Sequence, residues 1–154
     1  MATRRPQPEG LEPGYWKTRG LAEMSAAEWE ALCDGCGKCC LEKLEDVDTG
    51  EISFTNVACR LLDVGTCQCT RYAERRRYVP NCQSLCVESI LALGWLPRSC
   101  AYRLLAEGKD LPAWHYLVSG DRELVHRLGA SVRGRAVPES RAGPLEHHIV
   151  DWPA

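Results

Sequence analysis

The sequence predicts a small α+β domain, mainly helical, with short strands and irregular loops organised around a central cysteine-ligated metal region. The first observation is the length of 154 residues, enough for one domain with its own hydrophobic core. The second is that helical and strand patterns follow one another in short segments. The third is that all ten cysteines lie between positions 33 and 100, in the centre of the chain.

The first predicted helix covers residues 26–32. Ser25 and Glu28 form a capping box, in which Ser25 is the N-cap and Glu28 stands three residues further on. Apolar residues three apart give this helix a buried face. The helix therefore ends at Cys33, the first thiol of the chain.

Strands are predicted from the alternation of apolar and polar residues. Residues 51–57 alternate with period two, which is typical of a half-buried strand. Residues 61–64 are expected to be a second short strand or a turn, and 130–137 a late strand. Before them, residues 41–44 are expected to form a helical turn.

The remaining segments are predicted to be mainly helical. Thr70 is expected to cap a short helix that Pro80 stops. The arginines of this short helix are expected to form a face exposed to solvent. Their positive charge is also able to offset the negative charge of a thiolate cluster. Further helical segments are expected around Leu85 to Leu93, over 100–107 and over 121–128, with a packed loop or helical turn at 111–117.

Composition indicates the domain limits, the compartment and the partners. We expect a disordered tail at 1–14, a cysteine-rich metal-binding domain at 15–138 and a loosely docked C-terminal tail at 139–154. The sequence has no secretory signal and no apolar run of bilayer length, so we expect a cytoplasmic protein with no membrane partner. The net charge of −2 argues against nucleic acid, and no protein partner is identified.

The run from Cys33 to Cys40 has the spacing C-x2-C-x2-C-C. Thiolates are ligands for zinc and for iron–sulfur clusters. In a reducing compartment, so many cysteines indicate metal binding rather than disulfide bonds. Adjacent side chains diverge, so Cys39 and Cys40 are expected to serve two sites or two metals of one cluster. The triplet that precedes Cys40 also resembles a ferredoxin run.

Other thiols are available to complete such a centre. Cys67 and Cys69 lie on one side if the backbone is extended, and Cys59 and Cys82 flank them. Two four-sulfur sites need eight thiols, but spacing alone does not assign the partners. His115 is interpreted as a packed, hydrogen-bonded residue rather than as a ligand.

Several segments resemble the CxxCxxCC family of bacterial proteins, and most closely its YcgN branch. They are residues 33–40, 54–60, 67–69, 72, 74–76, 80–82 and 95–115. The resemblance implies a zinc- or iron-chelating domain. The wider family includes a module of flagellin lysine methylases that is associated with an iron–sulfur cluster. Cys86 lies outside the family pattern and is expected to be a buried thiol on a helix.

The sequence and the resemblance together predict a metal-binding protein that holds zinc, iron or an iron–sulfur cluster. The predicted metal ligands are Cys33, Cys36, Cys39, Cys40, Cys59, Cys67, Cys69, Cys82 and Cys100. One alternative is an iron–sulfur redox or radical-type group-transfer enzyme or its accessory, although no substrate or nucleotide motif is present. The other alternative is a metal carrier or sensor.

Overall fold

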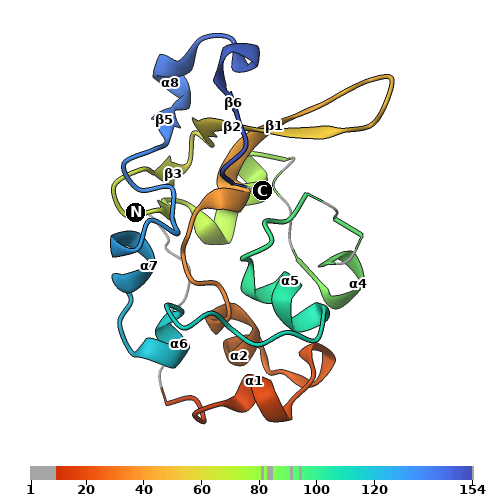
Figure 1. Ribbon diagram of the computed structural model, residues 1–154, viewed down its shortest axis with the longest axis vertical. Helices are drawn as coiled ribbons and strands as arrows, with labels where there is room; N and C mark the ends of the chain where they lie inside the picture. Colours follow the sequence, from red (N-terminus) through yellow and green to blue (C-terminus); the bar gives the residue numbers. More distant parts are fainter. Residues whose placement is uncertain (1–9, 81, 83–84, 91, 94, 154) are drawn as a thin grey trace.

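Short helices and short strands make up the computed structural model, which describes residues 10–80, 82, 85–90, 92–93 and 95–153 (Figure 1). The helices are α1 (Tyr15–Thr18), α2 (Ala26–Ala31), α3 (Arg75–Tyr78), α4 (Val87–Ile90), α5 (Ala101–Ala106), α6 (Tyr116–Ser119), α7 (Leu124–Arg127) and α8 (Glu139–Ala142). The strands are β1 (Leu41–Glu45), β2 (Ile52–Ala58), β3 (Leu62–Asp63), β4 (Gln68–Cys69), β5 (Val137–Pro138) and β6 (Ile149–Val150). Single 3₁₀ turns occur at Leu21–Glu23, Lys38–Cys40, Tyr72–Glu74 and Leu145–His148. The predicted mixed α and β character of a small domain is confirmed.

Helix α2 begins at the predicted capping box. The backbone N–H of Glu28 donates to Ser25 Oγ at 3.1 Å, and the N–H of Ser25 donates to Glu28 Oε1 at 2.9 Å. The Tyr15 hydroxyl donates to the Glu28 carbonyl at 2.7 Å, which fixes α2 against α1. The cap therefore determines where α2 starts, and α2 brings the chain to Cys33.

Strand β2 is the central strand of the larger sheet. It pairs antiparallel with β1, so that Leu41 lies opposite Ala58 and Glu45 lies opposite Ile52. On its other side β2 pairs with β5 in parallel and with β6 antiparallel. The helical turn expected at 41–44 is therefore wrong, because the backbone groups of this segment pair with β2 instead of with each other. The strand expected at 51–57 is confirmed.

Two further local predictions were wrong. The Thr70 side chain does not cap a helix: its Oγ1 donates to the Leu61 carbonyl at 2.8 Å, and the helical segment that follows begins without a side-chain cap. Of the late strand expected at 130–137, only Val137 is in a strand. The residues before it turn back on themselves, with Ala136 N donating to the Val132 carbonyl at 3.0 Å.

Helix α5 lies close to its predicted position. Cys100 is its N-cap, and Gly108 follows its end at a φ of +78°, as a C-terminal glycine does. Helices α6 and α7 are short, and α7 covers only part of the predicted segment 121–128. Beyond residue 139 the chain contributes α8 and β6, and Pro153 is fully buried.

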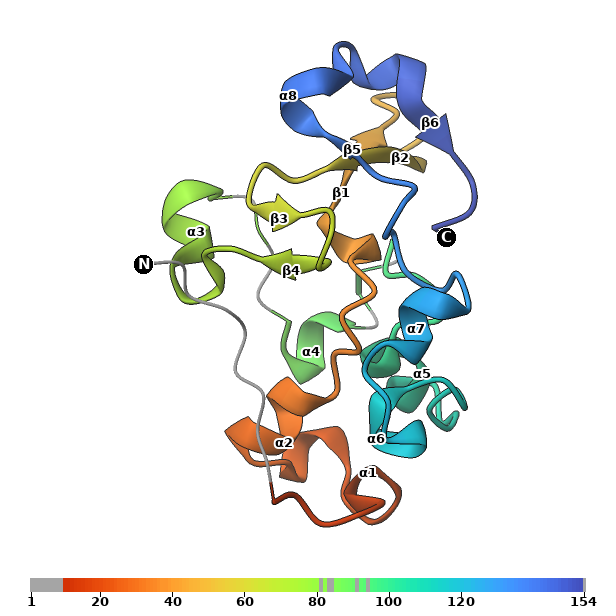
Figure 2. The ribbon, with the colours of Figure 1, turned by 90° about the vertical axis from the view of Figure 1, so that its left-hand side faces the viewer.

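Apolar side chains form two separate clusters. The helical core consists of Tyr15, Trp16, Leu32, Ile90, Leu96, Ala101, Tyr102 and Leu111. The sheet core consists of Leu41, Ala58, Leu62, Cys67 and Val132. Figures 1 and 2 show the segment between α2 and β1, drawn in orange, running from the lower helices up to the sheet. This segment is the cysteine run, which therefore connects the two cores.

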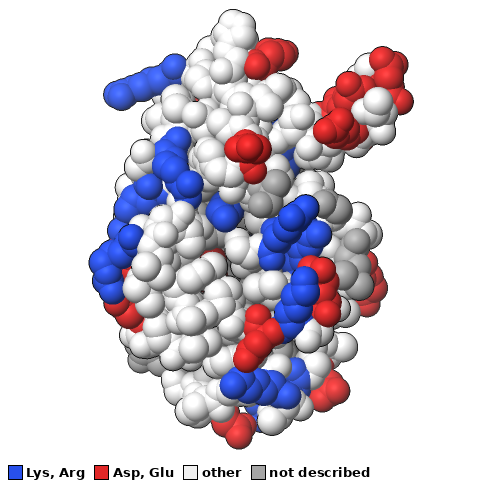
Figure 3. Space-filling view, viewed as in Figure 1, with Lys and Arg blue, Asp and Glu red and all other residues white. Residues whose placement is uncertain are grey.

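The turn between β1 and β2 projects from the body of the molecule (Figure 1). Figure 3 shows acidic side chains gathered at its tip, where Asp46 Oδ1 accepts from the N–H groups of Asp48 and Thr49 at 2.8 and 2.9 Å. Val47 at this tip is 97% exposed. None of the helices within the described residues has the length and apolar character needed to cross a bilayer.

Candidate metal centre

The cysteine run turns at two glycines with left-handed backbone conformation. Gly35 and Gly37 have φ values of +79° and +77°, which glycine adopts at little cost. The Cys36 N–H donates to Asp34 Oδ1 at 3.0 Å and closes the first turn. The Cys36 carbonyl in turn accepts from Val132 N at 2.9 Å, so the sheet core holds the run in place.

Four thiols of the run and of the α5 N-terminus lie near one another. The thiol of Cys36 interacts electrostatically with those of Cys33 and Cys39. The thiol of Cys100 interacts with the same two. Cys33 and Cys100 also pack against the helical core. We call Cys33, Cys36, Cys39 and Cys100 the first thiol group.

Four other thiols lie near one another on the side of the sheet. The thiol of Cys59 interacts with those of Cys69 and Cys82, and Cys82 also interacts with Cys69. Cys40 interacts with Cys59 as well as with Cys33 and Cys39, and both Cys40 and Cys59 pack against the sheet core. We call Cys40, Cys59, Cys69 and Cys82 the second thiol group.

The two thiol groups are neighbours. The Cys40 thiol is hydrogen bonded to that of Cys39, the next residue in the chain, and the Cys82 thiol also interacts with Cys39. No disulfide joins any of the ten cysteines, all of which the structure describes. Eight of the nine cysteines predicted as ligands are therefore gathered in one region between the two cores.

Cys67 is the ninth predicted ligand, and its thiol points elsewhere. It is buried and hydrogen bonded to the Ser131 side chain and to the backbone N–H groups of Val132 and Arg133. These hydrogen bonds direct the thiol toward residues 131–133. The extended backbone assumed for Cys67 is wrong: its φ is +59°, so its side chain and that of Cys69 do not share a side.

Cys86 precedes α4 and is exposed. The prediction that it is a buried thiol on a helix is therefore wrong. Its backbone N–H and carbonyl both bond to the Ser89 hydroxyl, which makes Cys86 part of the turn into α4. This turn holds the side chain away from the apolar face that Ile90 contributes to the helical core.

Burial raises the pKa of several of the grouped thiols and so favours their neutral form when no metal is bound. Burial raises the pKa of Cys100 to about 12, and it is also the main cause that raises the pKa of Cys36. For Cys40, the hydrogen bond with Cys39 is the larger cause of the raised pKa and burial the second. A metal ion that binds here must displace these protons, as it does in other thiolate sites.

Two basic side chains lie beside the second thiol group. The Arg75 guanidinium is hydrogen bonded to the Cys82 thiol and opposes the rise in its pKa that burial causes. Lys43 in β1 interacts with Cys39, Cys40 and Cys59. The sequence indicates that arginines are able to offset the charge of the thiols, but it gives no such indication for Lys43. The position of a single lysine in a strand becomes clear only when the strand is seen paired with its neighbour.

The donor set fits a thiophilic metal, but binding requires the thiols to move closer together. As the side chains stand, no three His, Cys, Asp or Glu residues within the described parts of the chain are arranged to hold a metal ion. Buried Asp34 Oδ2, in the loop between Cys33 and Cys36, has no hydrogen-bond partner among the described residues. An orphaned acceptor beside clustered thiols is consistent with a centre that is completed when its ligands close on a cation.

His115 is held on both ring nitrogens. It is fully buried, its Nδ1 accepts from Leu117 N at 3.1 Å, and its Nε2 donates to the Leu32 carbonyl at 2.7 Å. Burial lowers the pKa of this imidazole. Neither nitrogen is left for a metal, so the interpretation as a packed, hydrogen-bonded residue is confirmed.

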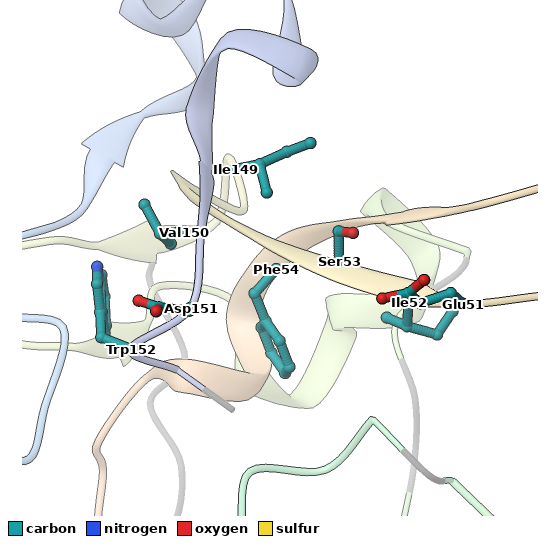
Figure 4. A pocket seen from close by; sticks show the side chains of 8 residues that line it. All are labelled: Glu51, Ile52, Ser53, Phe54, Ile149, Val150, Asp151 and Trp152. Atoms are coloured by element: carbon teal, nitrogen blue, oxygen red, sulfur yellow. The ribbon is translucent and has the colours of Figure 1, made fainter.

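A surface cavity of about 580 Å³ lies between β2 and the segment formed by β6 and the residues after it (Figure 4). Its lining residues are Glu51, Ile52, Ser53, Phe54, Ile149, Val150, Asp151 and Trp152. No cysteine lines it, so it plays no part in the arrangement of the thiol groups.

Comparison with known proteins places the chain in a family. Residues 32–101 match the CxxCxxCC family model, described as a "putative zinc- or iron-chelating domain". This match contains all the thiols of both thiol groups, and it also contains Cys67 and Cys86. No solved structure matches the chain.

Curated relatives resemble the chain over most of its length. A UPF0260 protein of Granulibacter bethesdensis is 60% identical over 139 residues, covering 90% of this chain and 84% of the relative. A UPF0260 protein of Rhizorhabdus wittichii is also 60% identical, over 89% of this chain and 94% of the relative. A UPF0260 protein of Agrobacterium fabrum is 55% identical, over 90% of this chain and 87% of the relative. The chain therefore belongs to the UPF0260 family, and its central segment is a CxxCxxCC domain.

Proposed function

We propose that the protein binds zinc or iron through two adjacent four-thiolate sites, one built from each thiol group. The observation that carries this proposal is the gathering of eight thiols between the two cores in two sets of four. Four thiolates are the usual ligand set of a structural zinc ion and of an iron–sulfur cluster.

The neighbours Cys39 and Cys40 support a division into two sites. Adjacent side chains diverge, so the two thiols cannot easily bind one mononuclear ion. Cys39 interacts with Cys36 and Cys100 of the first thiol group. Cys40 interacts with Cys59 of the second thiol group and also with Cys33 and Cys39 of the first, so it lies where the two groups meet. The peptide between Cys39 and Cys40 is then shared by both sites, which also suits a polynuclear centre.

Such a centre explains how the two cores are held together. Cys33 and Cys100 pack against the helical core, and Cys40 and Cys59 against the sheet core. Structural zinc contributes roughly 10–16 kcal/mol in small domains, which is comparable to the whole stability of a typical folded protein. A metal bound here would therefore stabilise the contact between the two cores as well as each thiol group.

Elemental analysis of protein purified without oxygen tests this proposal. We expect about two equivalents of zinc, or iron together with inorganic sulfide in a brown protein, since zinc is colourless. If the centre contains an iron–sulfur cluster, purification in air would lower the iron and sulfide content of the protein. Protein that folds fully with no zinc or iron, and with all ten thiols reactive toward a thiol reagent, would contradict the proposal.

The exposure of Cys39 favours a metal carrier or sensor as a second candidate role. Cys36 and Cys100 are buried or half-buried, but Cys39 is exposed. An exposed ligand gives an incoming chelator a point of attack on the first site. This role predicts that one equivalent of metal leaves within minutes in excess chelator, whereas a purely structural centre would hold both equivalents for hours.

A further inference from the structure

Lys43 is fixed between the thiols and two aromatic rings. Its Nζ donates to the carbonyls of Cys39 and Leu41 at 2.9 and 2.7 Å. The same ammonium lies 4.3 Å from the ring centroid of Trp95 and 5.4 Å from that of Phe54. These contacts hold the charge at one place, unlike the mobile charge of a surface lysine.

The ionisable groups around Lys43 are mainly thiols. It interacts with Cys39 of the first thiol group and with Cys40 and Cys59 of the second, in addition to its neighbour Glu42. Burial lowers the pKa of Lys43, and its interactions with Glu42 and with each of the three thiols raise it. Metal binding turns the thiols into thiolates and therefore strengthens the attraction for a cation at this place.

We propose that Lys43 is the fixed counter-cation of the thiolate centre and that its charge determines how tightly the centre holds its metal. This inference rests on the proposed function. Two sites of four thiolates with one divalent ion each carry a net charge of about −4, which requires cations nearby. Lys43 is placed at the peptide shared by both sites, so one charge acts on both.

The Lys43 ammonium also orients the backbone around Cys40 through its hydrogen bonds. An ammonium has three N–H donors, and two of them are used by the carbonyls of Cys39 and Leu41. These bonds span Cys40 and hold the backbone on both sides of it. The third donor is available to a metal-bound thiolate of either group, and a hydrogen bond to the sulfur stabilises the bound form. Lys43 is thus a positioning residue that acts through the ligands.

The metal affinities of three Lys43 variants and one control variant test this inference. Lys43→Met keeps the length and the apolar stem but removes the charge, Lys43→Arg keeps the charge, and Lys43→Gln serves if the methionine variant folds poorly. Lys109→Met removes the charge of a lysine whose side chain is 63% exposed, and it is the control. Zinc affinity is measured by competition with a chromophoric chelator, and zinc release is timed in excess chelator at low and high salt.

We expect Lys43→Met and Lys43→Gln to bind zinc about 10- to 100-fold more weakly, the range seen when a partner of the ligands is lost. Lys43→Arg should stay within about threefold of the wild type, and Lys109→Met should equal it. Equal affinity in wild type and Lys43→Met would overturn the inference, as would an equal loss in Lys43→Met and Lys43→Arg. If the wild type itself binds no zinc or iron, the proposed function fails as well, so the two failures are distinguished.

Discussion

Gly37 and Val132 approach so closely that a Cβ atom built on Gly37 would lie 2.8 Å from Val132 Cγ2. Real side chains do not tolerate this distance, so Val132 packs directly on the backbone of the cysteine run. The contact joins the run to the sheet core, of which Val132 is a fully buried member. Packing around Gly37 therefore helps to fix the backbone of the segment that carries Cys36 and Cys39.

The first prediction concerns Gly37→Ala, with Gly35→Ala as its control. Both positions have a left-handed backbone, which costs a residue with a side chain about 1–2 kcal/mol. Only Gly37 also has a neighbour in the way, because nothing lies within 4 Å of a Cβ built on Gly35. Gly37→Ala should therefore lose about 1–3 kcal/mol more than Gly35→Ala in urea unfolding. Equal losses would mean that Val132 moves aside without cost.

The second prediction separates Cys67 from Cys69, which stand two residues apart. Cys69→Ser should lower the metal content by about one equivalent, because Cys69 belongs to the second thiol group. Cys67→Ser should keep the full content, because its hydroxyl is able to bond to Ser131 and to the same backbone N–H groups. Cys86→Ser, at an exposed position, is the control. Loss of metal from Cys67→Ser would return Cys67 to the ligand set.

The third prediction concerns pH and the α2 cap. The backbone hydrogen bond from Ser25 is the main cause that holds the pKa of Glu28 below its ordinary value of 4.5, and Arg19 helps. A lowered folded-state pKa stabilises the protein fully above the unfolded-state value, and this stability is lost as the pH falls through the folded-state pKa. The free energy of unfolding of the wild type should therefore exceed that of Glu28→Gln at neutral pH, and the difference should disappear below about pH 4.5.

Urea unfolding of the two proteins between about pH 3 and pH 7 measures this difference. Comparing variants at each pH cancels the proton uptake that the thiols contribute to both. Glu23→Gln, at an exposed position near the same cap, is the control and should follow the wild type. A wild-type advantage that stays constant across the whole range would show that the charge of Glu28 does not support α2.

The fourth prediction concerns His115, which bridges Leu32 and Leu117. Replacing it with Phe leaves one carbonyl and one N–H buried without partners, which should cost about 2–4 kcal/mol in urea unfolding. The metal content should not change, because both ring nitrogens are already bonded to the backbone. His147→Phe at an exposed position should affect neither quantity. Metal loss from folded His115→Phe would instead identify His115 as a ligand.

Elements with a local signal were predictable from the sequence. The capping box at Ser25 and the alternation in β2 each depend on residues next to one another, and both elements lie where they were expected. Strand β1 was not predictable in this way. Its sequence suits a helical turn, and only pairing with β2 makes it a strand.

The candidate site was predictable as a composition but not as an arrangement. The adjacency of Cys39 and Cys40 is by itself enough to indicate two sites or two metals of one cluster. The separation of Cys67 depends on its left-handed backbone and on contacts with residues 131–133, which lie far along the chain. The place of Lys43 depends in the same way on Trp95. Contacts between distant segments leave no local trace in a sequence.

X-ray absorption at the metal edge of anaerobically purified protein tests the central claim most directly. Two four-thiolate sites predict a first shell of about four sulfur atoms at about 2.3 Å for each metal, at two metals per chain if the metal is zinc. The shell should be the same in Cys67→Ser. A first shell made mainly of nitrogen and oxygen, or a content well below one metal per chain, would contradict the account.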